Sequence, residues 1–247
     1  MRAPLGGTAD FIGPAGVNET AEFRFNNTLP VIEGGGYAGV EFEWQMDDYL
    51  FWLVGFGTWE GSSFGTQGGL MPFQRQLTQV LENRSVAISY NEMRFGARYI
   101  LVDKPRRYRI YSLLSLSNIF DIDYREDHVL RFITGPAEGF SRTVIVKAAS
   151  TGVLALQGGL GVDFPIAKRF SLGVEGSYML GVRPFYLKDP KITTDLQDND
   201  GVASMRLPVA PDAQRRLRYL AADGSSYHDM PLELDGWKLL LRASIYY

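Results

Sequence analysis

The histidines are the first candidates for chemistry, because the chain has no cysteine and only two histidines, His128 and His228. Ser225, Ser226 and Asp229 surround His228, and hydrolases use these residue types as nucleophile, base and orienting acid. Residues so close along one loop rarely converge into a triad, and a polar turn explains the same cluster. We therefore expect no catalytic residues and no enzyme, with a hydrolase kept as the alternative.

Metal and cofactor sites are not expected either. Gly55, Gly57 and Gly61 miss the dinucleotide-binding spacing and follow no βαβ unit, so we interpret them as glycines that line the interior of the fold. A group of acids lacks the spacing and the closing glutamate of an EF-hand loop, which favours a solvated loop. These acids are Asp189, Asp195, Asp198 and Asp200.

Arg215, Arg216 and Arg218 form a basic group. It fits either contact with lipid phosphates or, more simply, the solvated face of a helix. The formal net charge of the whole chain is −3, which argues against a protein that binds nucleic acid by neutralising phosphates.

The elements that would position these residues are strands, because apolar and polar residues alternate over several segments. In residues 37–46, Val40, Phe42 and Trp44 share one face, while Glu41 and Glu43 share the other. The same pattern predicts six further strands, in residues 49–59, 90–101, 108–116, 152–164, 170–178 and 236–247. A weaker pattern predicts the first strand in residues 19–27.

The connections between these strands alternate in length. Short turns at residues 47–48, 103–106 and 165–168 alternate with long loops, which we expect at 61–85, 121–150 and 183–235. This alternation is typical of an all-β, eight-stranded antiparallel up-and-down transmembrane β-barrel with short turns on one rim and long loops on the other. We expect an N-terminal extension over residues 1–18 and the barrel over 19–247.

Two short helices are expected within the long loops. Helical spacing follows Pro72 and also lies between Pro211 and Gly224. The apolar residues with this spacing are Phe73, Leu77, Val80 and Leu81 in the first segment and Leu217 and Leu220 in the second.

The charged face of the strands would line a narrow lumen, where buried charges must pair. We expect a salt-bridge plug there, with a small passive pore as the alternative. The predicted lumen charge network consists of Glu22, Arg24, Glu41, Glu43, Arg94, Arg98, Arg109, Glu175, Lys238 and Arg242.

The apolar face carries aromatic residues near the predicted short-turn rim, namely Tyr108, Phe164, Phe170 and Tyr247, and this is typical of the aromatic girdle of a membrane barrel. Strands of about ten residues can cross an outer membrane when tilted. No apolar run is long enough for a transmembrane helix, and we assume that a signal peptide was removed before Met1. A soluble lipocalin-like barrel, with its apolar face inside, is the remaining alternative.

Residues 159–165, 172–178 and 239–247 resemble the eight-stranded bacterial outer-membrane barrels of the OmpA and OmpX type. The resemblance implies a structural or surface-binding protein in contact with outer-membrane lipid and lipopolysaccharide, with possible extracellular partners; a lipid-modifying hydrolase is the alternative within that membrane. It also implies an assembly signal for the barrel-assembly machinery in the last strand, formed by Trp237, Leu239, Leu241, Ala243, Ile245 and Tyr247.

Overall fold

The computed structural model describes residues 11–12, 22–23, 32, 34–73, 76–195, 209–220 and 227–245. Nearly all of these residues lie in antiparallel strands, with one short 3-10 turn at Gly135–Ala137, so the protein is all-β. Within these ranges, no helix has both the length and the hydropathy that crossing a membrane requires.

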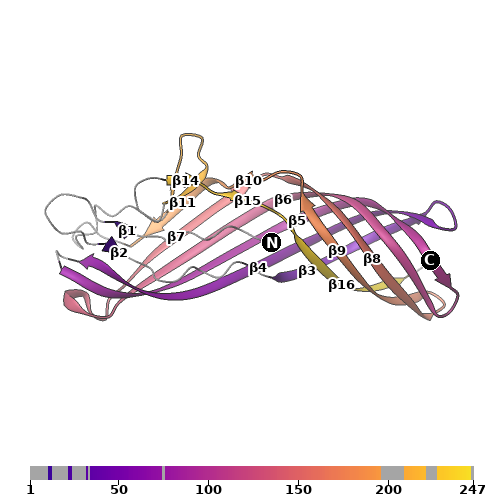
Figure 1. The fold of residues 1–247 in the computed structure, drawn as a ribbon, viewed down its shortest axis with the longest axis horizontal. Coiled ribbons are helices and arrows are strands. Elements are labelled where there is room, and N and C mark those ends of the chain that lie inside the picture. Colours follow the sequence, from indigo (N-terminus) through magenta and orange to yellow (C-terminus); the bar gives the residue numbers. More distant parts are fainter. Residues whose placement is uncertain are drawn as a thin grey trace.

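One antiparallel sheet of nine strands forms most of the molecule (Figure 1). Its continuous path runs β16-β9-β8-β6-β5-β4-β3, and β7 pairs with the second half of β6 and with β11. The strands are β3 (Gly35–Gln45), β4 (Leu50–Phe73), β5 (Gln76–Lys104), β6 (Tyr108–Phe132), β7 (Ser141–Ser150), β8 (Val153–Ala167), β9 (Phe170–Gly181), β11 (Lys188–Thr194) and β16 (Gly236–Ile245).

Three smaller sheets accompany the principal one. The described pairs are β1 with β2, β10 with β15, and β12 with β13 and β14. Their bounds are β1 (Phe11–Ile12), β2 (Glu22–Phe23), β10 (Phe185–Tyr186), β12 (Val209–Pro211), β13 (Leu217–Leu220), β14 (Tyr227–Asp229) and β15 (Pro231–Leu232).

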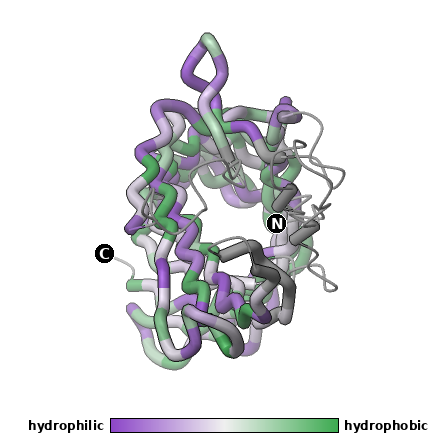
Figure 2. Tube along the Cα trace, turned by 90° about the vertical axis from the view of Figure 1, so that its left-hand side faces the viewer, coloured by the Kyte–Doolittle hydropathy of each residue, from purple (hydrophilic) through white to green (hydrophobic). Residues whose placement is uncertain are grey.

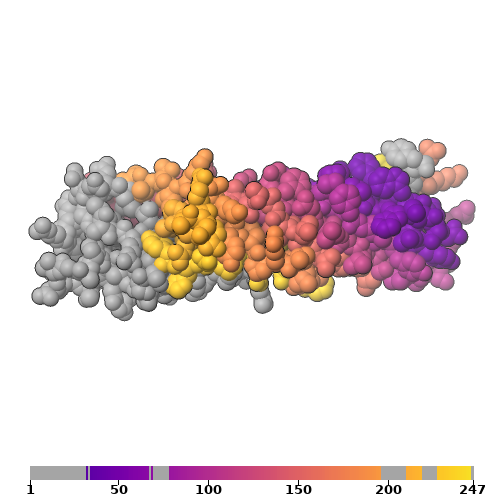
Figure 3. Space-filling view, turned by 90° about the horizontal axis from the view of Figure 1, so that it is seen from above, coloured from indigo at the N-terminus to yellow at the C-terminus, as the bar shows by residue number. Residues whose placement is uncertain are grey.

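Tight turns join β3 to β4, β5 to β6 and β8 to β9 at one end of the elongated molecule, which we call the turn end. Asp47 stabilises the first turn, since its Oδ1 accepts hydrogen bonds of 2.7 Å from the backbone N–H groups of Tyr49 and Leu50. In the space-filling view, β3 lies towards the turn end, whereas β11 and β14 lie towards the opposite, distal end (Figure 3).

The long loops predicted at 61–85 and 121–150 are wrong, because the strands continue through most of both segments. β4 and β5 stay paired from Leu50–Tyr99 to Phe73–Gln76, and β6 pairs with β7 over residues 122–131. The segment 183–235 also contains short strands. Polar residues on the outer face of these strands had suggested loops, but their inner face is buried.

Both predicted helices are wrong as well. Pro72 and Leu77 face each other across the β4–β5 hairpin, and Val80 is opposite Gly69. Leu217 is opposite Pro211 in the small distal sheet. Cross-strand pairing prevails here over a helical spacing that only a few apolar residues support.

The sheet wraps around the long axis of the molecule (Figure 2), but the described residues do not close it into a barrel, and the strands number more than eight. No pairing joins β3 to β16 in the described ranges. Six antiparallel steps separate the two, so they run in the same direction and cannot pair antiparallel with each other. Within the predicted first strand, residues 19–27, only Glu22–Phe23 are described, and they pair with β1.

The polarity of the two faces inverts along the long strands. In the half nearest the turn end, the turn-side half, apolar side chains point outwards and charged ones inwards. Exposed apolar residues of that half include Val40, Phe42, Trp52, Phe95, Leu114, Leu160, Leu172 and Leu241.

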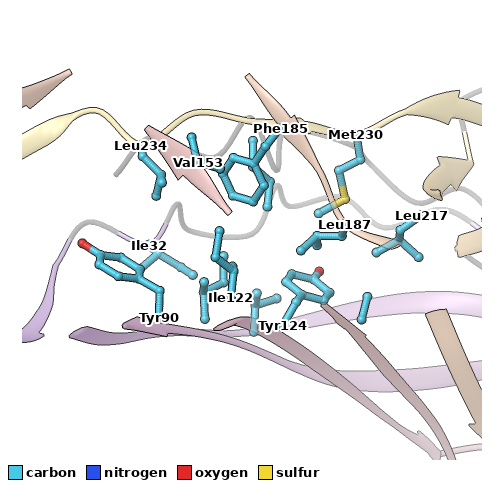
Figure 4. Close-up of a cluster of buried hydrophobic side chains, with 14 of the residues drawn as sticks. Ile32, Tyr90, Ile122, Tyr124, Val153, Phe185, Leu187, Leu217, Met230 and Leu234 are labelled. Carbon is cyan, nitrogen blue, oxygen red and sulfur yellow. The ribbon is translucent and has the colours of Figure 1, made fainter. Parts of the chain in front are cut away.

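In the distal half most inward residues are apolar, apart from the buried charges of Glu82, Arg84, Glu126 and His128, and the outward ones are mostly polar. On β5, for example, Val86 and Ile88 are buried, while Ser85 and Ser89 lie on the outer face. The apolar core of the described residues lies here, between β5–β8 on one side and β10, β15 and their flanking residues on the other (Figure 4). Its members include Ile32, Val86, Ile88, Ile122, Val144, Val146, Phe185, Leu187, Leu217, Met230 and Leu232.

Candidate functional site

A network of buried charges fills the interior of the turn-side half. Alternation along β5 directs Arg94 and Arg98 inwards, and Glu175 of β9 points at them from across the interior. The Glu175 carboxylate lies 2.8 Å from Arg98 Nη2 and 3.4 Å from Arg94 Nη1. Glu41 of β3 pairs with both arginines, so two carboxylates and two guanidinium groups share one buried site.

Tyr111 of β6 connects this network to β16. Its hydroxyl donates to Glu175 at 3.0 Å and accepts from Arg242 Nη1 at 2.7 Å, while the Arg98 guanidinium lies over its ring. A side chain at Gly161 would collide with this ring, since a Cβ there would lie 2.1 Å from Tyr111. The glycine on β8 therefore makes the space that the tyrosine needs.

The network also links the two unpaired edges of the sheet. Arg242 of β16 lies 3.1 Å from Glu41 and 2.8 Å from Glu43, which both belong to β3. Its other nitrogen lies 3.6 Å from Asp163 of β8. Ion pairs thus cross the seam between β3 and β16 where backbone hydrogen bonds are absent from the described residues.

A second inward group lies one step farther from the turn end. Lys238 Nζ is 2.5 Å from the Glu92 carboxylate, which also accepts a hydrogen bond from Ser117. The same ammonium lies 4.5 Å from the centre of the Tyr37 ring. Each buried carboxylate of the interior is thereby matched by a cation, as buried charges require.

The structure brings together six residues of the predicted lumen network, Glu41, Glu43, Arg94, Arg98, Glu175 and Arg242, and pairs the seventh, Lys238, with Glu92 in the second inward group. Arg109 is not among them, since it pairs with Asp103 near the turn end at 3.2 Å. The side chain of Glu22 and the whole of Arg24 lie outside the described residues. The prediction overlooked Glu92 and Tyr111, although both have the period-2 phase of their inward neighbours.

The predicted assembly residues on β16 lie on its outer face. Trp237, Leu239 and Leu241 are 77–87% exposed, the largest values among the exposed large apolar side chains. Tyr247 lies outside the described residues.

A separate ion cluster is buried in the distal half. Glu126 of β6 pairs with Arg84 and accepts a hydrogen bond of 2.7 Å from the Tyr124 hydroxyl. His128 lies between two carboxylates, 2.6 Å from Glu82 and 3.1 Å from Glu126. Burial lowers the pKa of His128, but Glu126 and Glu82 outweigh it and raise the pKa to about 9.

This distal cluster has the residue types of a general-base site but not its access. His128 is 1% exposed and Glu126 is fully buried, so no substrate could reach them without unfolding of the strands. The pKa of Glu126 is held well below its usual range, because Arg84 and His128 outweigh the opposing effect of burial. The cluster therefore keeps a charged histidine paired inside the distal half.

The other sequence candidates do not converge. Asp229 pairs with Arg218 at 3.2 Å and with Arg216 at 3.5 Å, and Ser225 and Ser226 lie outside the described residues. Arg215 and Arg216, expected on a helix, pair with the acids Asp189 and Asp212 beside β13.

The predicted acid loop does not form a cation site in the described ranges. Asp189 pairs with Arg215, and Asp195 accepts a hydrogen bond from the Thr143 backbone, while Asp198 and Asp200 lie outside those ranges. In the part of the chain that the structure describes, no group of three or more histidine or acidic side chains is placed to hold a metal ion.

Comparisons with models of known families, with curated proteins and with solved structures find no match to this chain.

Proposed function

We propose that this protein is an outer-membrane β-barrel whose turn-side half crosses the lipid and whose distal half stands outside it as a structural and surface-binding element. The observation that carries the proposal is the inversion of polarity along single strands. On β5 the outward residues are Phe95, Tyr99 and Leu101 in the turn-side half but Ser85 and Ser89 in the distal half. A protein wholly in water would not change the sign of its outer face in this way.

Strand length agrees with this division. β5 has 29 residues, and a strand of that length extends about 95 Å, while the apolar band of an outer-membrane barrel is only about 25 Å tall. Part of each long strand must therefore lie in water even when the strands are tilted. The apolar core of the distal half gives that part the stability of a water-soluble β-structure (Figure 4).

In the membrane, the barrel would be closed by an eighth transmembrane strand between β3 and β16. Unpaired strand edges are not tolerated in lipid, and these two edges run in the same direction, so one strand antiparallel to both would satisfy them. The ion pairs of Arg242 with Glu41 and Glu43 would lie beneath it.

The proposal implies contacts with lipid and with lipopolysaccharide around the apolar band, and it gives the barrel-assembly machinery a last strand with Trp237, Leu239 and Leu241 on its outer face. The buried ion pairs of Arg94, Arg98 and Glu175 favour a plugged interior over an open pore.

The four tryptophans test the orientation directly. Trp44, Trp52 and Trp237 point outwards in the turn-side half and are 49–80% exposed. Trp59 is partly buried in the distal half and stacks on Tyr90 at 5.1 Å. We expect brominated acyl chains to quench a variant that retains only Trp52, whereas a variant that retains only Trp59 serves as the matched control and stays bright.

The same preparations should show a heat-dependent shift in electrophoretic mobility after refolding into detergent micelles. Equal quenching of Trp52 and Trp59, or a monodisperse protein in buffer without detergent, would overturn the membrane assignment. The second result would instead favour a soluble barrel.

A further inference from the structure

Three cations lie side by side on the outer face of the distal half. Arg125 of β6 is directly opposite Lys147 of β7, and Lys147 is directly opposite Lys191 of β11. All three side chains are exposed on the same face. Neighbouring strands are about 4.8 Å apart, so the three Cα atoms lie within about 10 Å.

Such a row is unfavourable without a partner, because like charges directly opposite each other destabilise a sheet. Arg125 is partly compensated by Asp127, at 2.8 Å. Lys147 and Lys191 make no ion pair with any residue in the described ranges. The arginines near β13 differ in this respect, since Arg215 and Arg216 are each paired with an acid.

The row lines a surface groove with a volume of about 560 Å³. Small residues of neighbouring strands form part of its lining, among them Ala87, Ser89 and Ala149. Three acids, Glu60, Asp123 and Asp189, line the groove as well, and Asp189 is paired with Arg215. The groove therefore offers ammonium groups for a phosphate together with carboxylates that can accept hydrogen bonds from sugar hydroxyls.

The groove lies just beyond the proposed apolar band. Leu154 on β8 is an exposed apolar residue of the band. Lys147 lies about 20 Å from Leu154 along the chain from β7 to β8. Because barrel strands are tilted, the separation of the two residues along the membrane normal is smaller. Phosphorylated sugars of a glycolipid stand at this level when the acyl chains cover the band.

We infer that Arg125, Lys147 and Lys191 form a docking site for the phosphorylated sugar headgroup of an outer-membrane glycolipid. The inference rests on the proposed function, since it needs the acyl chains beside the apolar band. The predicted basic group of Arg215, Arg216 and Arg218 is a weaker candidate for this headgroup, because those arginines are paired with acids.

The test uses the full chain refolded in uncharged detergent micelles, with bisphosphorylated lipid A as the probe and native mass spectrometry as the readout. We expect the double variant Lys147→Gln, Lys191→Gln to bind lipid A at least about tenfold more weakly than the unmodified chain. The matched control is Lys168→Gln, Arg169→Gln, which removes two exposed cations at the turn end and should leave binding unchanged.

Two further probes identify the chemistry. Lipid A without its phosphates should bind the unmodified chain as weakly as bisphosphorylated lipid A binds the double variant. Inorganic phosphate should not displace lipid A at equal concentration. Equal binding by the double variant, equal binding of the dephosphorylated lipid, or displacement by inorganic phosphate would each overturn the inference.

Folding is followed separately through the heat-dependent mobility shift. The double variant should keep the shift and unfold at slightly higher denaturant concentration, because it removes two like charges that face each other. If the unmodified chain shows no shift, the proposed function fails and the glycolipid site fails with it. If the shift is normal and the double variant binds like the unmodified chain, only the site is refuted.

Discussion

Glu126 holds the distal ion cluster together, because Arg84, Tyr124 and His128 all contact its carboxylate. Glu126→Gln would leave the buried Arg84 guanidinium without its anion, and we expect a loss of about 3–5 kcal/mol in the free energy of unfolding. Denaturant unfolding of the refolded protein measures this loss.

The adjacent Asp127 provides a matched control for that substitution. Asp127 points outwards and pairs with Arg125, whose side chain is 54% exposed, so Asp127→Asn should cost no more than about 1 kcal/mol. Equal losses for both variants would mean that the distal half is not a packed, water-excluding structure.

His128 gives the distal half a dependence on pH. Its pKa is about 9 in the folded protein against 6.5 for an ordinary histidine, so the folded state binds the proton more tightly. The resulting stabilisation is complete below about pH 6.5 and disappears as the pH rises through 9. We expect the free energy of unfolding to fall by about 3 kcal/mol between pH 6 and pH 10. In His128→Gln this fall should be absent, and a similar fall in that variant would assign it to other groups.

At the residue level the sequence predicted much of the interior network, because Glu41, Glu43, Arg94 and Arg98 alternate strictly with apolar neighbours. Tyr111 and Asp163 have the same inward phase, but the charged groups that they contact could not be assigned from it. Which inward residues meet across the interior depends on register and curvature, which one strand does not encode.

At the scale of elements, β16 is the strand on which assembly should depend. It pairs along its whole length with β9, and its Lys238 and Arg242 reach Glu92, Glu41 and Glu43. A variant that ends at Asp235 should therefore not gain the heat-dependent mobility shift. A variant that lacks residues 1–10 but retains the chain before β3 should keep it. Folding of the first variant into a heat-modifiable form would refute the assignment of β16 as the assembly strand.

The sequence indicated the turn-side strands well but not their distal continuations. On β5 the large apolar residues are odd-numbered from Met93 to Tyr99, and even-numbered from Val86 to Tyr90. Even-numbered residues face inwards in both halves of β5, but the interior is charged in the turn-side half and mainly apolar in the distal half. A search for one apolar face therefore loses the strand where the phase switches, and the polar outer residues beyond that point resemble a loop.

At the scale of the whole molecule, the proposed function implies two different barriers in series along the axis. The turn-side interior is filled by ion pairs such as Arg98–Glu175, and the distal interior is filled by apolar residues such as Ile88, Ile122 and Leu232. An ion would have to pass both, and neither barrier depends on the other.

We therefore expect no stepwise conductance when the protein is reconstituted into planar lipid bilayers. Arg98→Ala should remain silent too, because it weakens the ion-pair barrier while the apolar barrier stays intact. The informative comparison is Arg98→Ala combined with Ile88→Ser and Ile122→Ser, which introduces polar side chains into both barriers. Discrete steps from the unmodified chain would show that the interior is open and would replace the structural role with that of a small pore. Steps from Arg98→Ala alone would show instead that the distal core does not close the passage, since charge pairing would then be the only barrier.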